Sequence, residues 1–267
     1  MVDELAVEVA SGPAAFTWSE PDRWQRASVE LAEETAVTIF VDRVELATLM
    51  CTPEKLNFLV AGFLRSEGLI DCLDDIAMMR VCDEEQMVDV RLMRPREVPG
   101  RRILTSGCGG GVTFDEGRAL KPVRSSVTYT PTQLLRSMKL MLQSCGSRRE
   151  RGGLHVSALS DGETLLAVAR DVGRHNTLDK ICGECLFRGI PTEDRILLTT
   201  GRLSSEMMVK AAKMGVPVAV SINSATSRSV SLGEDLGITL VGYARGSRLT
   251  VYTHRERLQP LVSCEQC

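Results

Sequence analysis

One cysteine lies in a sequence context that suits sulfur chemistry. Cys108 follows Gly107 and is followed directly by Gly109, Gly110 and Gly111. Glycine gives a loop conformational freedom and lets a bulky ligand approach its backbone closely. A thiol on such a loop could attack a donor persulfide, hold the outer sulfur and present it elsewhere. The alternative interpretation is a turn in which the cysteine is incidental.

A second group of polar residues falls between a predicted strand and a predicted helix. It runs from Arg170 to Asn176 and contains Asp171, Gly173, Arg174 and His175, with Asp179 and Lys180 close behind. α/β folds place ligands at such junctions. The basic side chains suit phosphate, the carboxylates suit a base edge or a ribose, and the histidine can relay a proton. The alternative is a helix cap with a solvated charged face.

Three further polar loops each follow a predicted strand. Thr199–Glu206 includes Gly201, Arg202, Ser204 and Ser205, and its hydroxyl and N–H groups would meet an anion at a helix N-terminus. Ser221–Arg228 repeats the pattern. Tyr243–Arg248 offers two arginines, a glycine and an aromatic ring, which suits a nucleotide, although an ordinary hairpin turn is the alternative. Together the loops favour one shared nucleotide pocket.

Two Cys-x-x-Cys pairs also call for an interpretation. Cys182 with Cys185 and Cys264 with Cys267 could form a tetrahedral zinc site if they met in space. The stretch between the pairs is much longer than a compact zinc module uses. Cys182 also continues an apolar helical face, so core packing is the alternative there. The zinc-deaminase motif is absent.

Composition limits the class of protein. The chain has 267 residues, of which 43% are hydrophobic and 25% charged, and its net charge is −3. A chain of this length and composition can form a hydrophobic core. It lacks the overall positive charge that is typical of nucleic-acid-binding proteins. No apolar run is long enough to span a membrane and the N-terminus does not resemble a secretory signal. Nine cysteines, an odd number, then favour free thiols in the cytoplasm.

The first half of the chain should form a small mixed unit. Strands are predicted at 37–40 and 44–50, then a helix capped by Thr52 and ended by Gly68, then a hairpin of 78–81 with 87–92. Residues 94–130 are predicted to have irregular structure, and a second helix should begin after Thr130-Pro131.

From residue 154 strands and helices alternate. A hairpin of 155–159 with 164–169 precedes a helix near 174, and strands at 196–199, 216–222 and 238–243 alternate with helices at 204–214 and 230–236. This order favours a layered α/β domain with a parallel portion. The predicted division is an arm at 1–34, a smaller α+β domain at 35–145 that ends in a helix and carries the Cys108 loop, a cofactor-binding α/β domain at 146–258, and a tail at 259–267.

At these residues the chain resembles the FdhD/NarQ family of formate dehydrogenase accessory sulfurtransferases. The similarity covers about residues 34 to 257 in a single order. The matching stretches are Ala61–Gly68, Thr105–Gly109, Asp171–Asn176, Leu178–Lys180, Gly201–Met207 and Ile238–Tyr243.

The resemblance implies a cytoplasmic homodimer whose main domain is similar to the cytidine-deaminase fold without its zinc ligands. It implies that persulfide sulfur from a cysteine desulfurase passes through Cys108 to the bis-molybdopterin guanine dinucleotide cofactor of formate dehydrogenase, with no catalytic metal of the protein's own. The residues implied to bind this cofactor are Tyr243, Ala244, Arg245, Gly246, Ser247 and Arg248, with His155, Asp171, Gly173, Arg174, His175, Gly201, Arg202, Ser204 and Ser205 lining the same pocket.

One position departs from the family pattern. Many members have a second cysteine three positions after the first, and here that position is Gly111. This favours an alternative in which the protein is a chaperone that holds and delivers the cofactor without carrying sulfur. A third hypothesis is a metal-binding regulatory protein that uses the two Cys-x-x-Cys pairs.

Overall fold

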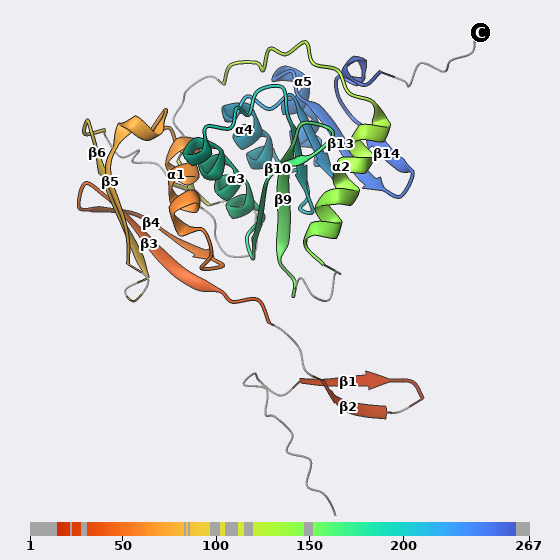
Figure 1. Ribbon diagram of the computed structural model, residues 1–267, viewed down its shortest axis with the longest axis horizontal. Coiled ribbons are helices and arrows are strands. Elements are labelled where there is room, and N and C mark those ends of the chain that lie inside the picture. The colour runs from red at the N-terminus through yellow and green to blue at the C-terminus, as the bar shows by residue number, and fades with distance from the viewer. Residues whose placement is uncertain are drawn as a thin grey trace, which may run out of the picture.

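The computed structural model describes the chain in several stretches. They are residues 15–21, 23–27, 31–82, 84, 86–96, 102–104, 112–114, 120–146 and 152–259. Two units, each built on its own sheet, lie side by side, with helices α1 and α3 between the sheets (Figure 1). This is the mixed α/β architecture predicted from the sequence.

The smaller unit is a four-stranded sheet with one helix on one face. Its strand order is β4-β3-β6-β5, and its elements are β3 (Thr35–Val41), β4 (Val44–Cys51), α1 (Leu56–Ser66), β5 (Ile76–Cys82) and β6 (Met87–Leu92), with a 3-10 turn at Leu73–Asp75. Alternate residues such as Ile39, Val88 and Val90 point to α1 and are fully buried. The predicted strands and hairpin are confirmed, because strict alternation buries one sheet face.

The predicted start of α1 is wrong by one turn. The sequence predicts Thr52 as the cap of the helix, but α1 begins at Leu56 after Lys55, whose backbone is left-handed with φ 55°. The amide and hydroxyl groups of Thr52 bond instead to Asp171 and Val172 of the larger unit, so they are not available to cap a helix. The predicted stop is confirmed, since Gly68 follows the helix with φ 75°.

The larger unit is a six-stranded sheet in the order β10-β9-β11-β12-β13-β14. Its strands are β9 (His155–Ser160), β10 (Leu165–Asp171), β11 (Ile196–Thr199), β12 (Val218–Ser221), β13 (Thr239–Arg245) and β14 (Arg248–Val251). Strands β11, β12 and β13 are parallel, and the other pairings are antiparallel. The parallel portion predicted from alternating strands and helices is therefore confirmed.

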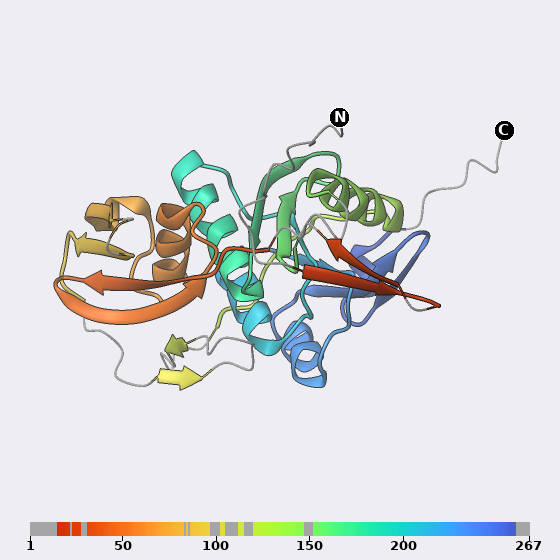
Figure 2. The same cartoon turned by 90° about the horizontal axis from the view of Figure 1, so that it is seen from below.

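Helices cover both faces of this sheet (Figure 2). On one side lies α2 (Pro131–Ser144), and on the other lie α3 (Arg174–Arg188), α4 (Ser205–Lys213) and α5 (Ser227–Asp235). Thr130 caps α2 and exchanges hydrogen bonds with Gln133, as the Thr-Pro signal predicts. Because α2 packs on the larger sheet through Leu134, Met138 and Met141, a division at residue 145 separates this helix from the core it belongs to.

The two units meet where α1 crosses α3. A Cβ added at Gly62 would lie 1.8 Å from the carbonyl oxygen of Asp179, and one added at Gly183 would lie 1.9 Å from that of Phe58. The helices therefore touch backbone to backbone, which only glycine allows. A buried ion pair lies beside this crossing, because Lys210 Nζ is 2.6 Å from an Asp179 oxygen that also accepts from Ser66.

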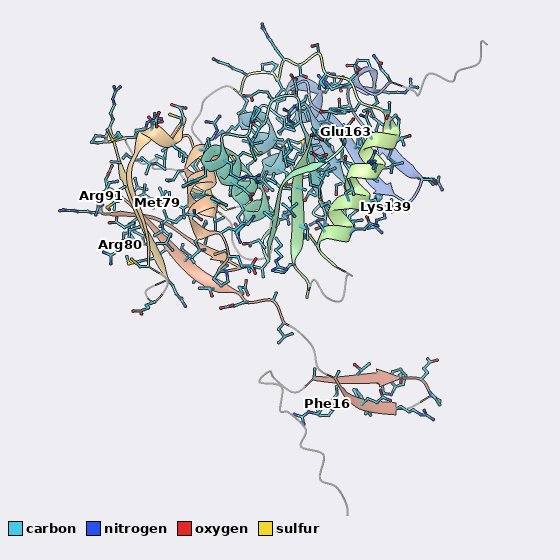
Figure 3. The ribbon with its side chains drawn as sticks, viewed as in Figure 1. Phe16, Met79, Arg80, Arg91, Lys139 and Glu163 are labelled. Atoms are coloured by element: carbon cyan, nitrogen blue, oxygen red, sulfur yellow. The ribbon has the colours of Figure 1, made fainter. Side chains whose placement is uncertain are left out.

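Two short hairpins complete the described chain. β1 (Ala15–Ser19) pairs with β2 (Arg23–Ala27), away from the main body in Figure 1, and Figure 3 shows Phe16 on it. β7 (Arg102–Leu104) pairs with β8 (Val112–Phe114) inside the stretch predicted to be irregular, and a 3-10 turn lies at Arg255–Arg257. Among the described residues, no helix has the length and apolar character needed to cross a membrane.

Candidate functional site

Polar residues from five strands gather at one edge of the larger sheet. The parallel strands β11, β12 and β13 end there at Thr199, Ser221 and Arg245. Strand β9 runs antiparallel to β11, so it begins at this edge with His155, which is opposite Asp171 at the end of β10. The fold thus brings to one edge the strand-end loops that the sequence analysis singled out.

Hydroxyl groups fix the loop after β11. The Thr199 hydroxyl accepts from the Gly201 N–H at 3.0 Å, and the Ser221 hydroxyl donates to the Gly201 carbonyl at 2.6 Å. A Cβ at Gly201 would lie 2.9 Å from the Cβ of Arg174, so the glycine lets the start of α3 pack against this loop. The loop is therefore rigid at its base and lies beside a basic side chain.

The same loop continues into the N-terminus of α4. Arg202 is exposed, Ser204 is buried at the cap position and Ser205 opens the helix. Backbone N–H groups at a helix start attract anions. A carboxylate lies in the first turn as well, because Glu206 accepts from the Ser204 hydroxyl at 3.3 Å.

Two histidines lie in this region. His175 Nε2 is 3.1 Å from a carboxylate oxygen of Glu206, which joins the starts of α3 and α4. Burial lowers the pKa of His155 below its usual value, and the positive charge of Arg174 lowers it further. His155 is therefore neutral at pH 7, and its ring can both donate and accept a hydrogen bond.

The end of β13 and its turn into β14 place several exposed groups at this edge. Tyr243 has φ 51° and is 54% exposed, and its N–H donates to the Asn223 carbonyl at 3.0 Å. Arg245 and Arg248 are exposed, and Arg245 Nε donates to a main-chain carbonyl at 3.0 Å. Ala244 is fully buried in the core on the α2 side, so its side chain is not available to a ligand. Gly246 and Ser247 form the exposed turn.

Asp171 lies in the interior and not at the surface of the edge. Its carboxylate is 2.6 Å from Lys180 Nζ, and it accepts from the main-chain N–H of Thr52 at 3.1 Å, from that of Gly173 at 2.8 Å and from Asn176 at 2.8 Å. Both charged side chains are almost completely buried. The geometry makes Asp171 a support for the start of α3, where Arg174 and His175 are located.

Thr52 is the member of this network that sequence reasoning missed. It belongs to the smaller unit, and its carbonyl accepts from Lys180 at 2.9 Å. Its partners are more than a hundred positions away in the sequence, so no local pattern could show the contact. The Thr-Pro signal pointed to a helix cap instead.

One of the two Cys-x-x-Cys pairs lies within the residues that the structure describes. Cys182 and Cys185 belong to α3 and are buried in the core of the larger unit, and burial raises the pKa of each thiol to about 12. Both thiols are therefore protonated at neutral pH, the form that suits packing in an apolar core. Cys264 and Cys267 lie outside the described residues. Within the described ranges, no group of three or more histidine, cysteine, aspartate or glutamate side chains is placed to bind a metal.

Cys108 also lies outside the described residues. The strands on either side of it in the sequence, β7 and β8, pair through Leu104 and Val112. The sulfur-carrying role of Cys108 therefore stays a prediction, as do the cofactor contacts of the strand-end residues.

Comparison with known proteins identifies relatives of this chain. The model of the FdhD/NarQ family matches residues 32–259. A protein of Bacillus subtilis (strain 168) named sulfur carrier protein FdhD is 35% identical over 249 residues, 89% of this chain and 95% of its own. A protein of the same name from Staphylococcus aureus (strain MRSA252) is 38% identical over 232 residues, 84% of this chain and 88% of its own.

A solved structure shares the fold. It is the crystal structure of a protein from Desulfotalea psychrophila assigned as a formate dehydrogenase accessory protein, with a TM-score of 0.79 and 24% sequence identity. The match covers 92% of this chain and 98% of that one.

Proposed function

This chain belongs to the FdhD/NarQ family, and we propose that it is a sulfur carrier that supports a formate dehydrogenase. The observation that carries the proposal is the similarity to proteins named as sulfur carriers, because it extends over almost the full length of both chains. The proposal includes the cytoplasmic location and the homodimer that the resemblance implies.

Cys108 is the proposed sulfur acceptor. Its thiolate attacks the outer sulfur of a persulfide on a cysteine desulfurase, and a new S–S bond forms on Cys108. The S–S bond on the donor breaks, and the donor cysteine leaves as a thiolate. One thiolate is consumed and one released, so the step needs no outside oxidant. The sulfur then passes to the bis-molybdopterin guanine dinucleotide cofactor, which is cargo and not a resident group.

The strand-end edge is the proposed site for this cargo. Tyr243 offers a ring on which guanine can stack, and the guanidinium groups of Arg245 and Arg248 suit the diphosphate. Arg202 and the N-terminus of α4 give a second place for anionic oxygen. These groups are exposed, and the loops that present them are tied to the sheet by main-chain hydrogen bonds.

The less exposed residues at this edge would hold other side chains and loops in place. Asp171 and Gly173 set the start of α3, and through it the places of Arg174 and His175. Gly201 allows the loop before α4 to lie against Arg174. Neutral His155 supplies a hydrogen-bonding group that adds no charge beside the arginines.

Mass spectrometry of the intact protein tests the sulfur-carrying step. Wild type and Cys108→Ala are incubated with a cysteine desulfurase and cysteine. We expect wild type to gain one sulfur atom that reductant removes, and the variant to gain none. A gain that persists in Cys108→Ala would contradict the assignment and direct attention to the other thiols.

The cofactor chaperone is the second candidate, and Gly111 favours it. A mechanism that needs two thiols in one loop is not open to a chain with glycine at this position. If Cys108→Ala activates formate dehydrogenase as well as wild type does, the chaperone function stands and the sulfur carrier function fails.

A further inference from the structure

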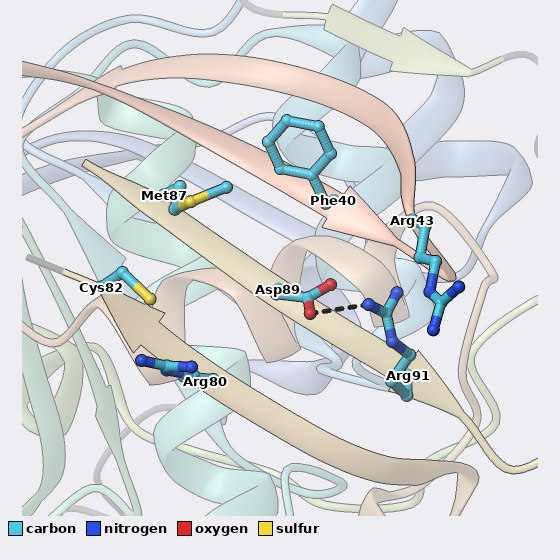
Figure 4. A pocket seen from close by; sticks show the side chains of 7 residues that line it. All are labelled: Phe40, Arg43, Arg80, Cys82, Met87, Asp89 and Arg91. Carbon is cyan, nitrogen blue, oxygen red and sulfur yellow. Dashed lines mark hydrogen bonds and ion pairs between the residues drawn. The ribbon is translucent and has the colours of Figure 1, made fainter. Parts of the chain in front are cut away.

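The outer face of the smaller sheet is uncovered within the described part of the chain. Helix α1 covers the inner face, where Val88 and Val90 are fully buried. Met87, Asp89 and Arg91 alternate with them on β6 and therefore point away from α1 (Figure 4). This face takes no part in the strand-end site.

Side chains of three adjacent strands meet on this face. Asp89 on β6 is opposite Phe40 on β3 and opposite Arg80 on β5, and Met87 is opposite Cys82. They line a cavity of about 350 Å³. Phe40 and Met87 supply its apolar surface, and the charged groups lie to one side of them (Figure 4).

Positive charge is in excess in this cavity. Arg43, Arg80 and Arg91 line it, and Asp89 is the one carboxylate among its lining residues. Asp89 is 2.9 Å from Arg91, which leaves Arg43 and Arg80 without an ion pair within the described ranges. A further carboxylate, that of Glu45 on β4, is on the residue paired with Phe40 but does not line the cavity.

Buried polar atoms without partners point to an occupant. Asp89 Oδ1 and Arg91 Nη1 are both buried, and neither has a hydrogen-bond partner among the described residues. A buried donor or acceptor without a hydrogen-bond partner destabilises the folded protein, because it has lost its water without gaining a new partner. An occupant that supplied one acceptor and one donor would remove that cost.

We propose that this cavity binds an acidic, partly apolar segment of a partner protein. Carboxylates of the segment would meet Arg43 and Arg80, its main chain would satisfy Asp89 and Arg91, and an apolar side chain would pack on Phe40 and Met87. A small anion alone would leave the apolar surface uncovered and would lie close to the Asp89 carboxylate. The proposal does not depend on the sulfur chemistry of Cys108.

Fluorescence anisotropy on the full chain tests it. The probe is a short fluorescein-labelled peptide in which aspartate and glutamate alternate with leucine and phenylalanine. We expect it to bind wild type and to bind about tenfold or more weakly to Arg43→Gln and to Arg80→Gln, since each loses a charge-assisted hydrogen bond. Both arginines are exposed, so their loss should not prevent folding.

Lys139→Gln is the matched control, because it removes one positive charge from α2, on the opposite side of the molecule from Arg80 and Arg91 (Figure 3). We expect it to bind the peptide as wild type does, and Cys108→Ala to do the same. Equal weakening by Lys139→Gln, or no binding to wild type, would overturn the proposal.

The same samples test two other possible occupants of the cavity, a small anion and a second copy of this chain. Displacement of the peptide by an equal concentration of inorganic phosphate would show a small-anion site and overturn the proposal. Self-association in size-exclusion chromatography that Arg43→Gln and Arg80→Gln abolish would show that a second copy covers this face, and would also overturn it.

Discussion

Asp171 Oδ2 lies 2.6 Å from Lys180 Nζ, and the two side chains are 0% and 1% exposed. The pair connects the end of β10 to the middle of α3, and the same carboxylate accepts from the main-chain N–H of Thr52 in the smaller unit. The sequence suggests Asp171 as a ligand-binding residue. In the structure it is buried and connects the two units instead. Its effect on the candidate site is exerted through the start of α3.

Lys180→Met should destabilise the protein by about 3–5 kcal/mol, because it leaves the Asp171 carboxylate buried without its charged partner. Urea unfolding followed by circular dichroism measures the change. Lys139→Met, on the exposed side of α2, should change the free energy of unfolding by less than about 0.5 kcal/mol. A loss below about 1 kcal/mol for Lys180→Met would contradict the structural role.

Gly62→Ala should destabilise the protein by about 3 kcal/mol or more, because its Cβ would lie 1.8 Å from the backbone oxygen of Asp179 and the helices would have to separate. Thermal unfolding measures it. Gly233→Ala in α5 is the control, since the nearest atom there, 2.9 Å away, is the end of a leucine side chain that can move. Equal effects of the two changes would show that the crossing is not tight.

His155 should titrate below pH 6.5, because burial and then the charge of Arg174 disfavour its protonated form. The unfolded chain binds this proton first, so the contribution of His155 to stability is present above pH 6.5 and is lost as pH falls through the lowered pKa. NMR titration of the ring resonances measures it, with only three histidines to assign. Arg174→Gln should raise the pKa of His155.

His254 serves as an internal reference in the same NMR titration. Burial opposes protonation of His254, but its contacts with Glu234 and Glu256 outweigh burial and raise its pKa. The stability that His254 contributes is therefore present below pH 6.5 and is lost as pH rises through the raised pKa. If His155 titrated above His254, the electrostatics described for the strand-end site would be wrong.

Native alkylation should separate the thiols by exposure. At pH 8, iodoacetamide should label Cys72, which is exposed, and should leave Cys51, Cys182 and Cys185 unlabelled, because burial raises the pKa of each of these three to about 12. Peptide mass spectrometry gives the result, with urea-unfolded protein as the control in which all are labelled. Labelling of Cys182 in folded protein would show that the core of the larger unit opens.

The sequence alone determined most of the secondary structure and the class of the fold. Alternating apolar residues predicted β3, β4 and the β5–β6 hairpin, and the Thr-Pro signal predicted the start of α2. These signals are local, since a strand or helix is specified by neighbours a few positions apart. The family, too, could be recognised from short motifs in order along the chain, and the match over residues 32–259 agrees.

Only the tertiary structure decided which polar residues are available to a ligand. Asp171 is the last residue of β10 and Tyr243 lies near the end of β13, but one is buried in an ion pair and the other is 54% exposed. Thr52 carries a helix-cap signal, but its groups bond across the interface between the two units, so α1 starts later. Both outcomes depend on contacts between residues far apart in the chain, and the burial that those contacts create decides whether a polar group supports the fold or faces a ligand.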